Sequence, residues 1–201
     1  MRSRAGATGR RSAIRVATML PAIVSGAATA WTVPRRVLRR PSCRNGSGAN
    51  MEVIDLKGRK GLVVGIANEH SLAWSAAQHF RNAGADLAIT YLNDKAKSFV
   101  EPLAREAGAS LVLPCDVGEP GQLKGVFEVI ETEWSRLDFL LHSIAWARKE
   151  DLHGRLTDCS AEGFAESMLI SCHSFIHMAK LAEPLMEKGG SLMTLSYYGA
   201  E

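Results

Sequence analysis

The sequence has no apolar run near the roughly 20 residues that a membrane span needs. Its four cysteines, at positions 43, 115, 159 and 172, form no C-x-x-C pair, which argues against a zinc site or a disulfide framework and favours free thiols in a reducing compartment. Residues 51–201 carry 21 acidic side chains and only 14 basic ones, so nothing in them suggests binding to nucleic acid. These absences favour a globular domain that acts on a small molecule.

The first fifty residues have no Lys, Asp or Glu, but they contain ten Arg. They show no hydrophobic periodicity, so we expect a disordered extension (1–50) outside a single domain (51–201). The favoured interpretation is upstream sequence before a true start at Met51. The alternatives are an organellar transit peptide and an exported signal, because Arg10-Arg11 precedes an apolar stretch that ends in small residues.

Short apolar runs alternate with amphipathic segments after Met51. Buried strands are predicted at 61–66, 86–91, 110–115, 139–144 and 191–197, and helices at 72–83, 94–107, 122–134 and 161–188. This alternation predicts an α/β fold, a Rossmann-type doubly wound parallel sheet in one domain, with its strands in the order 3-2-1-4-5. A ligand is expected at the carboxyl edge, between the first and fourth strands.

The first strand-to-helix turn, residues 65–73, lacks the G-x-G-x-x-G pattern of common dinucleotide sites. Only Gly65 is present, and Ser71 stands where a helix N-cap belongs. Ser71 could cap the helix and also offer its hydroxyl to a phosphate. The alternative is a plain cap in an ordinary turn.

Five motifs follow in order along residues 51–201: G-x5-S-L-A, TYLNDKAK, CDV, HSIAW and MTLSYYGAE. With these motifs the chain resembles the NADH-dependent enoyl-acyl-carrier-protein reductases, a divergent branch of the short-chain dehydrogenase/reductase superfamily. An ordinary member would show T-G-x3-G-x-G in the first turn and N-N-A-G after the fourth strand, and this chain shows neither. The resemblance implies reduction of trans-2-enoyl thioesters of acyl carrier protein with NADH, in type II fatty acid synthesis, by a homotetramer.

The resemblance also assigns cofactor contacts to individual residues. It places the pyrophosphate and its adjoining ribose beside Gly65, Ser71 and Leu72. The adenosine would lie beside Leu92, Asp116 and Val117, and the nicotinamide ribose beside Ser143 and Ile144. Each position has an ordinary alternative: Asp116 as a turn former, Ser143 as a backbone partner and Leu92 as a core residue. The segment that follows the second strand has no Arg but has Asp94, which favours NADH over NADPH, although Lys95 and Lys97 lie further on.

For the substrate end, the resemblance implies an acyl pocket edged by Ala145, Trp146 and Ala147, with Tyr197 as the first of two active-site tyrosines. Ordinary strand packing is the alternative for Tyr197, and the adjacent Tyr198 leaves the choice between the two open. His173 and His177 have metal-ligand spacing on one helix, but no third ligand accompanies them, so no metal is expected.

In the family, a Tyr-x6-Lys pair follows this tyrosine about two turns downstream, and the sequence given ends at Glu201. We therefore expect the chain as given to be a truncated reductase that is aggregation-prone and has little activity. The alternatives are a non-catalytic nucleotide-binding fragment and another short-chain reductase that acts on a ketone or alcohol. The expected location is the bacterial cytoplasm, or a plastid or mitochondrion if residues 1–50 are a transit peptide.

Overall fold

A six-stranded parallel sheet forms the centre of the molecule. The computed structural model describes the backbone of residues 14–19 and all of residues 54–196. The strands are β1 (Ile14–Met19), β2 (Lys60–Val64), β3 (Asp86–Tyr91), β4 (Leu111–Pro114), β5 (Phe139–His142) and β6 (Gly190–Leu195). Their order across the sheet is β1-β6-β5-β2-β3-β4, and every neighbouring pair is parallel. The five strands after residue 54 thus have the predicted order 3-2-1-4-5.

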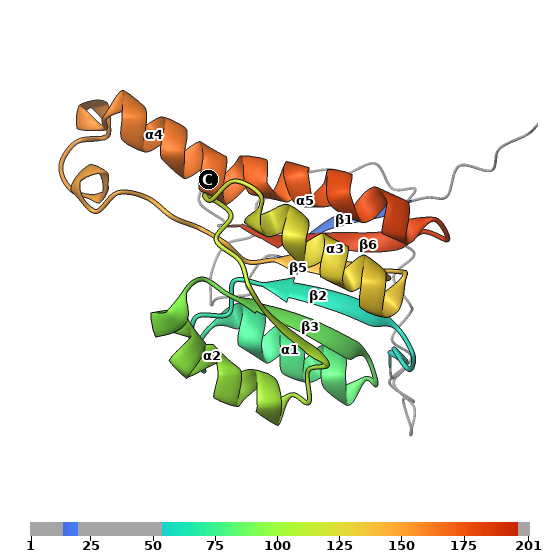
Figure 1. Cartoon of the computed structure of the whole chain (residues 1–201). Coiled ribbons are helices and arrows are strands. Elements are labelled where there is room, and N and C mark those ends of the chain that lie inside the picture. Colours follow the sequence, from blue (N-terminus) through green and yellow to red (C-terminus); the bar gives the residue numbers. More distant parts are fainter. Residues whose placement is uncertain (1–13, 20–53, 197–201) are drawn as a thin grey trace, which may run out of the picture.

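Helices cover both faces of the sheet (Figure 1). One face carries α1 (Leu72–Asn82) and α2 (Asp94–Glu106), and the other carries α3 (Gln122–Trp134) and α5 (Ser174–Ala182). Successive side chains of a strand point to opposite faces. Leu62 and Val64 of β2 therefore join the core with α3 and α5, and Val63 joins the core with α1 and α2. Burial on both faces explains why each strand reads as a continuous apolar run.

The N-terminal segment differs from the expectation that all of residues 1–50 lie outside the fold. Ile14–Met19 forms the edge strand β1, which pairs in parallel with β6 from Gly190 to Leu195. Without β1, the outer side of β6 would be an edge with unpaired backbone N–H and C=O groups. Sequence periodicity could not predict this strand, because six residues embedded in an Arg-rich segment give no amphipathic pattern.

The helix predicted for residues 161–188 is built from four pieces. It runs through α4 (Ala161–Met168), the π-helical turn η3 (Leu169–His173), α5 and the 3-10 turn η4 (Glu183–Met186). Pro184, the second residue of η4, cannot donate a backbone hydrogen bond, so the α-helix does not continue through it. π-Helical turns are rare and are frequently found at functional sites. Figure 1 shows the segment as one long rod, with α5 beside the sheet and α4 projecting beyond the ends of the strands.

Two 3-10 turns, η1 (Glu150–Leu152) and η2 (Leu156–Asp158), interrupt the connection between β5 and α4. Asp151 holds the end of this connection, because its two carboxylate oxygens accept hydrogen bonds from the Ser160 backbone N–H and hydroxyl at 2.8 and 2.9 Å.

Among the described residues, no helix is both long enough and apolar enough to cross a membrane.

Candidate functional site

A cleft of about 750 Å³ opens where β2, β3, β4 and β5 end. Parallel strands place their carboxyl ends at one edge, which is where open α/β sheets bind ligands. Eight of the residues singled out in the sequence line this cleft: Gly65, Leu92, Asp116, Val117, Ser143, Ile144, Ala145 and Trp146. Ser71, Leu72 and Ala147 are not among the lining residues, and Tyr197 lies outside the described part of the chain.

Gly65 lines the cleft at the place where the ends of β2 and β5 approach each other closely. Its φ of +101° lies in the left-handed region, and a Cβ atom at this position would lie 2.1 Å from the Ser143 carbonyl oxygen. The strand ends are held together by the Ser143 N–H, which donates to the Val64 carbonyl at 2.9 Å. A side chain at position 65 would therefore force the ends of β2 and β5 apart.

Ser71 takes the N-cap position of α1, but its side chain does not cap the helix. Its hydroxyl donates instead to the Asn68 carbonyl at 2.7 Å, inside the turn. The prediction of the N-cap position is confirmed, and the prediction of a side-chain cap is wrong, because the turn supplies a nearer acceptor. The first N–H groups of α1, which have no partner within the helix, therefore donate no hydrogen bond to this side chain.

A tight turn after β4 orients Asp116. One oxygen of its carboxylate accepts from the Gly118 N–H at 2.9 Å, and the Asp116 N–H donates to the Gln122 side-chain carbonyl at 2.8 Å. The adjacent Val117 packs against the core beneath the cleft. The predicted turn-forming role of Asp116 is thus present in the structure, and its second carboxylate oxygen is not used by that turn.

The segment after β5 is anchored to the long helix. The Trp146 N–H donates to the Ser171 hydroxyl oxygen at 2.9 Å, and the same hydroxyl donates to the Trp146 carbonyl at 3.1 Å. Ile144 packs inward against the core, whereas Trp146 is 39% exposed. One serine of the π-helical turn therefore satisfies both backbone groups of a residue that lines the cleft.

Sequence reasoning did not single out three lining residues that lie on helical segments, Phe99, Glu166 and Ile170. Glu166 lines the cleft and forms an ion pair with Arg148 at 2.8 Å. Lys95 also lines the cleft, whereas the Lys97 ammonium lies 5.7 Å from the centre of the Tyr91 ring. The three missed positions belong to none of the five motifs, because they enter the cleft only through the packing of the helices.

Burial and the nearby Asp116 carboxylate raise the pKa of the Cys115 thiol to about 11. The thiol is therefore protonated at neutral pH, which makes it a poor nucleophile. Cys115, Cys159 and Cys172 are all unpaired. In the part of the chain that the structure describes, no three His, Cys, Asp or Glu side chains converge as metal ligands.

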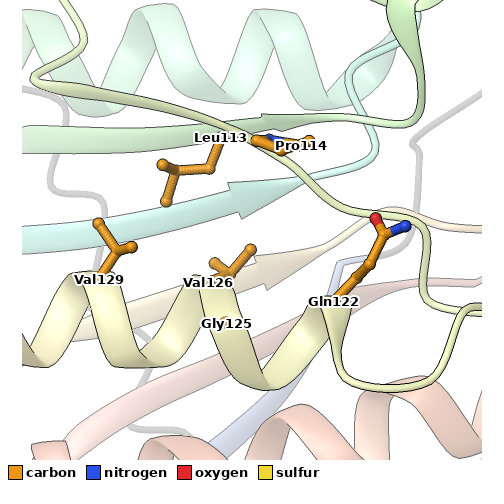
Figure 2. Close-up of a pocket in the computed structure, with 6 residues that line it drawn as sticks. All are labelled: Leu113, Pro114, Gln122, Gly125, Val126 and Val129. Atoms are coloured by element: carbon orange, nitrogen blue, oxygen red, sulfur yellow. The ribbon is translucent and has the colours of Figure 1, made fainter.

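A second, apolar cleft of about 340 Å³ lies between β4 and α3 (Figure 2). It is lined by Leu113, Pro114, Gln122, Gly125, Val126 and Val129. None of these six side chains can titrate, so this cleft offers no acid–base chemistry. Gln122 connects the two clefts, because its amide oxygen holds the Asp116 turn.

The family model described as "Enoyl-(Acyl carrier protein) reductase" matches residues 65–201. The chain belongs to this family. Over the aligned residues, this chain is 42% identical to a curated enoyl-acyl-carrier-protein reductase [NADH] of Rhizobium meliloti. It is 44% identical to that of Rickettsia conorii and 43% identical to that of a Nostoc species. The alignments cover 73% of this chain and 54–58% of those relatives, so the chain spans little more than half of their length.

Solved enoyl-acyl-carrier-protein reductases have the same fold. The Anaplasma phagocytophilum enzyme, solved with NAD, is 46% identical to this chain, with a TM-score of 0.70. The match covers 73% of this chain and 56% of that enzyme's chain. The Aquifex aeolicus enzyme is 42% identical with the same TM-score, covering 73% and 58%. The Bacillus cereus enzyme, solved with NADP+ and an indole naphthyridinone, is 38% identical with a TM-score of 0.67, covering 72% and 57%. The predicted family and Rossmann-type fold are therefore confirmed.

Proposed function

We propose that this chain forms the NADH-binding part of an enoyl-acyl-carrier-protein reductase, which reduces trans-2-enoyl thioesters. The observation that carries the proposal is the approach of Gly65 to the Ser143 carbonyl at the carboxyl edge of the sheet. In open α/β sheets a dinucleotide binds in the crevice at this edge, at the point where the strand order reverses, which here lies between β2 and β5. The missing Cβ at Gly65 lets the ends of these two strands meet closely, and the cleft opens beside them.

At the adenosine end, we assign the unused oxygen of Asp116 to accept a hydrogen bond from the adenine amine. Leu92 and Val117 supply apolar surface beside the base, and both line the cleft. At the pyrophosphate, Ser71 and Leu72 contribute the amino end of α1, where backbone N–H groups favour an anion. The Ser71 hydroxyl would act there as an acceptor or would have to release the Asn68 carbonyl.

At the other end of the cleft, Ser143 and Ile144 would hold the nicotinamide ribose, and Ala145, Trp146 and Ala147 would border the acyl chain. NADH would supply the hydride for the β-carbon of the enoyl thioester. The role of Tyr197 as the first active-site tyrosine is part of the same proposal. A hydroxyl near the thioester carbonyl would stabilise negative charge that develops on its oxygen.

We also propose that NADH is preferred to NADPH. The Asn93 side chain is occupied as the cap of α2, accepting from the Ala96 N–H at 3.0 Å, and Asp94 follows it. Asp94 does not itself line the cleft, but its negative charge lies next to the lining residues Asn93 and Lys95 and would oppose a 2′-phosphate there. Lys95 is the single Lys or Arg among the lining residues. Tighter binding of NADPH than of NADH would contradict this preference.

The protein that carries this chain is proposed to assemble as a homotetramer in the cytoplasm of a bacterium. Apolar side chains stand exposed along the long helical segment: Phe164, Met168, Leu169 and Ile176 are 61, 46, 49 and 59% exposed. Contiguous exposed apolar surface of this kind marks association sites. Light scattering after gel filtration tests the assembly, and a monomer at micromolar concentration would count against it.

Calorimetric titration of the 201-residue protein with NADH tests the proposed function directly. Saturable binding is expected, with weaker binding of NADPH, and no binding of either nucleotide would overturn the proposal. The substrate class is tested on the protein that carries this chain, by following NADH consumption with crotonyl and acetoacetyl thioesters. Consumption with the acetoacetyl thioester alone would identify a ketone reductase instead.

A further inference from the structure

A polar cluster lies buried beneath the cleft, at a place where the core is otherwise apolar. His142, the last residue of β5, is 1% exposed, and Ser174 of α5 is 4% exposed. His142 Nε2 lies 2.8 Å from the Ser174 hydroxyl, and Nδ1 lies 3.2 Å from the Thr194 hydroxyl on β6. None of these three side chains lines the cleft, so the proposed function does not explain them.

The hydrogen bonds fix where the imidazole proton resides. A carbonyl oxygen can only accept, so the Ser174 hydroxyl must donate its single proton to the Ile170 carbonyl at 2.6 Å. Ser174 Oγ can then only accept from His142, which places the ring proton on Nε2 and leaves Nδ1 to accept from Thr194. Burial lowers the pKa of His142 to about 4, so the ring is neutral at physiological pH.

The π-helical turn η3 also contacts Trp146, four residues after His142. Ile170, which accepts from Ser174, and Ser171, which bonds both backbone groups of Trp146, both belong to η3. Residues 143–145 are therefore flanked by two anchors, His142 and Trp146, which both bind to the same long helical segment. All three line the cleft, and they are the residues assigned above to the nicotinamide ribose and the acyl pocket.

We propose that His142, Ser174 and Ser171 are positioning residues that clamp residues 143–145 in register with the nicotinamide end of the cofactor. This inference rests on the proposed function. It gives the π-helical turn a role, because the turn presents Ser171 to the loop and the Ile170 carbonyl to Ser174 at once. Small displacements at a reacting centre are costly, so a rigid clamp at this end of the cleft matters more than one beneath the adenine.

Comparing NADH with ADP, which lacks both the nicotinamide ring and its ribose, separates positioning from folding. In calorimetric titrations of the full chain, His142→Leu is expected to weaken NADH binding about tenfold, the effect of one lost buried hydrogen bond, and to change ADP binding less than about twofold. His142→Gln is expected to restore most of the NADH affinity, because its amide N–H can still reach Ser174.

Ser171→Ala removes the second anchor at a half-buried position and is expected to weaken NADH binding selectively in the same way, so it serves as the test if His142→Leu does not fold. Ser167→Ala is the matched control. Like the Ser174 hydroxyl, the Ser167 hydroxyl donates to a carbonyl four residues back, that of Gly163 at 2.7 Å, but it contacts neither anchor. Equal weakening of both ligands, or no weakening of either, would overturn the clamp while leaving the proposed function standing. A wild-type chain that binds neither ligand would overturn both.

Discussion

The two halves of the cleft are held together in different ways. In the half assigned to adenine, the hydrogen bonds that involve side chains are local: Asp116 to Gly118, Asn93 to Ala96, and Asp116 to Gln122 join residues two, three and six positions apart. In the half assigned to nicotinamide, they join residues 25 positions apart at Trp146 and Ser171, and 32 and 52 positions apart at His142 with its two partners.

The difference has consequences for stability as well as for binding. A local turn orders itself at small entropic cost and can form before the sheet is complete, whereas distant residues meet only after the chain between them is packed. The nicotinamide half therefore depends on the assembled core, and the adenine half depends mainly on its own loops. Substitutions in the two halves should differ accordingly in which ligand they affect.

Gly65→Ala should have the largest effect, because it acts where the two halves meet. The added Cβ would collide with the Ser143 carbonyl and would also occupy a φ of +101°. We expect binding of both NADH and ADP to fall about 100-fold or more as the strand ends separate. Gly58→Ala is the control, since Gly58 has a φ of +67° but open space around it. Similar loss in both variants would attribute the effect to backbone strain alone.

Acid should weaken the nicotinamide half through His142. Its pKa is lowered from 6.5 to about 4 in the folded protein, so the unfolded chain takes up the proton first as the pH falls. The free energy of unfolding should be highest above pH 6.5 and fall by about 3 kcal/mol towards pH 4 from this group. Urea unfolding at several pH values measures this change. His142→Gln should lose that part of the slope, and an unchanged slope would show that other groups cause it.

Asp116→Ala should weaken NADH and ADP alike, by about tenfold, because a charged acceptor for the adenine amine is removed. Asp116→Asn separates the two uses of this side chain. Its amide oxygen can still accept from the Gly118 N–H, so the turn is retained while the second acceptor oxygen is lost. We expect both variants to bind weakly and only Asp116→Ala to lose stability. Selective loss of NADH binding would place Asp116 in the other half.

Gln122→Ala should have the smallest effect, about threefold on both ligands, since it removes one exposed hydrogen bond to the Asp116 N–H. Gly125→Ala on the same helix is the matched control. A methyl group added there would have no atom within 4 Å, so it should leave affinity unchanged and raise stability by up to about 1 kcal/mol. Thermal unfolding and titration of both variants measure the two effects separately.

Sequence periodicity predicted most of the architecture because each strand is a short apolar run between amphipathic helices. It missed the π-helical turn at Leu169–His173, since one extra residue in a helical turn leaves the pattern of apolar positions nearly intact. It also missed β1, whose pairing depends on an edge that exists only once β6 is in the sheet. Glu166 and Phe99 went unnoticed because no local pattern marks a helix residue that borders a cleft.

Periodicity and short motifs were enough to predict the α/β fold, the strand order, the family and the turn that Asp116 forms, because the patterns that indicate them lie within short segments of the sequence. Folding in three dimensions determined that the Ser71 hydroxyl serves its own turn, that Gly65 meets Ser143, and that two anchors on one helix hold residues 143–145. Most of these contacts join residues that are far apart along the chain, and their geometry is set only when the helices pack on the sheet.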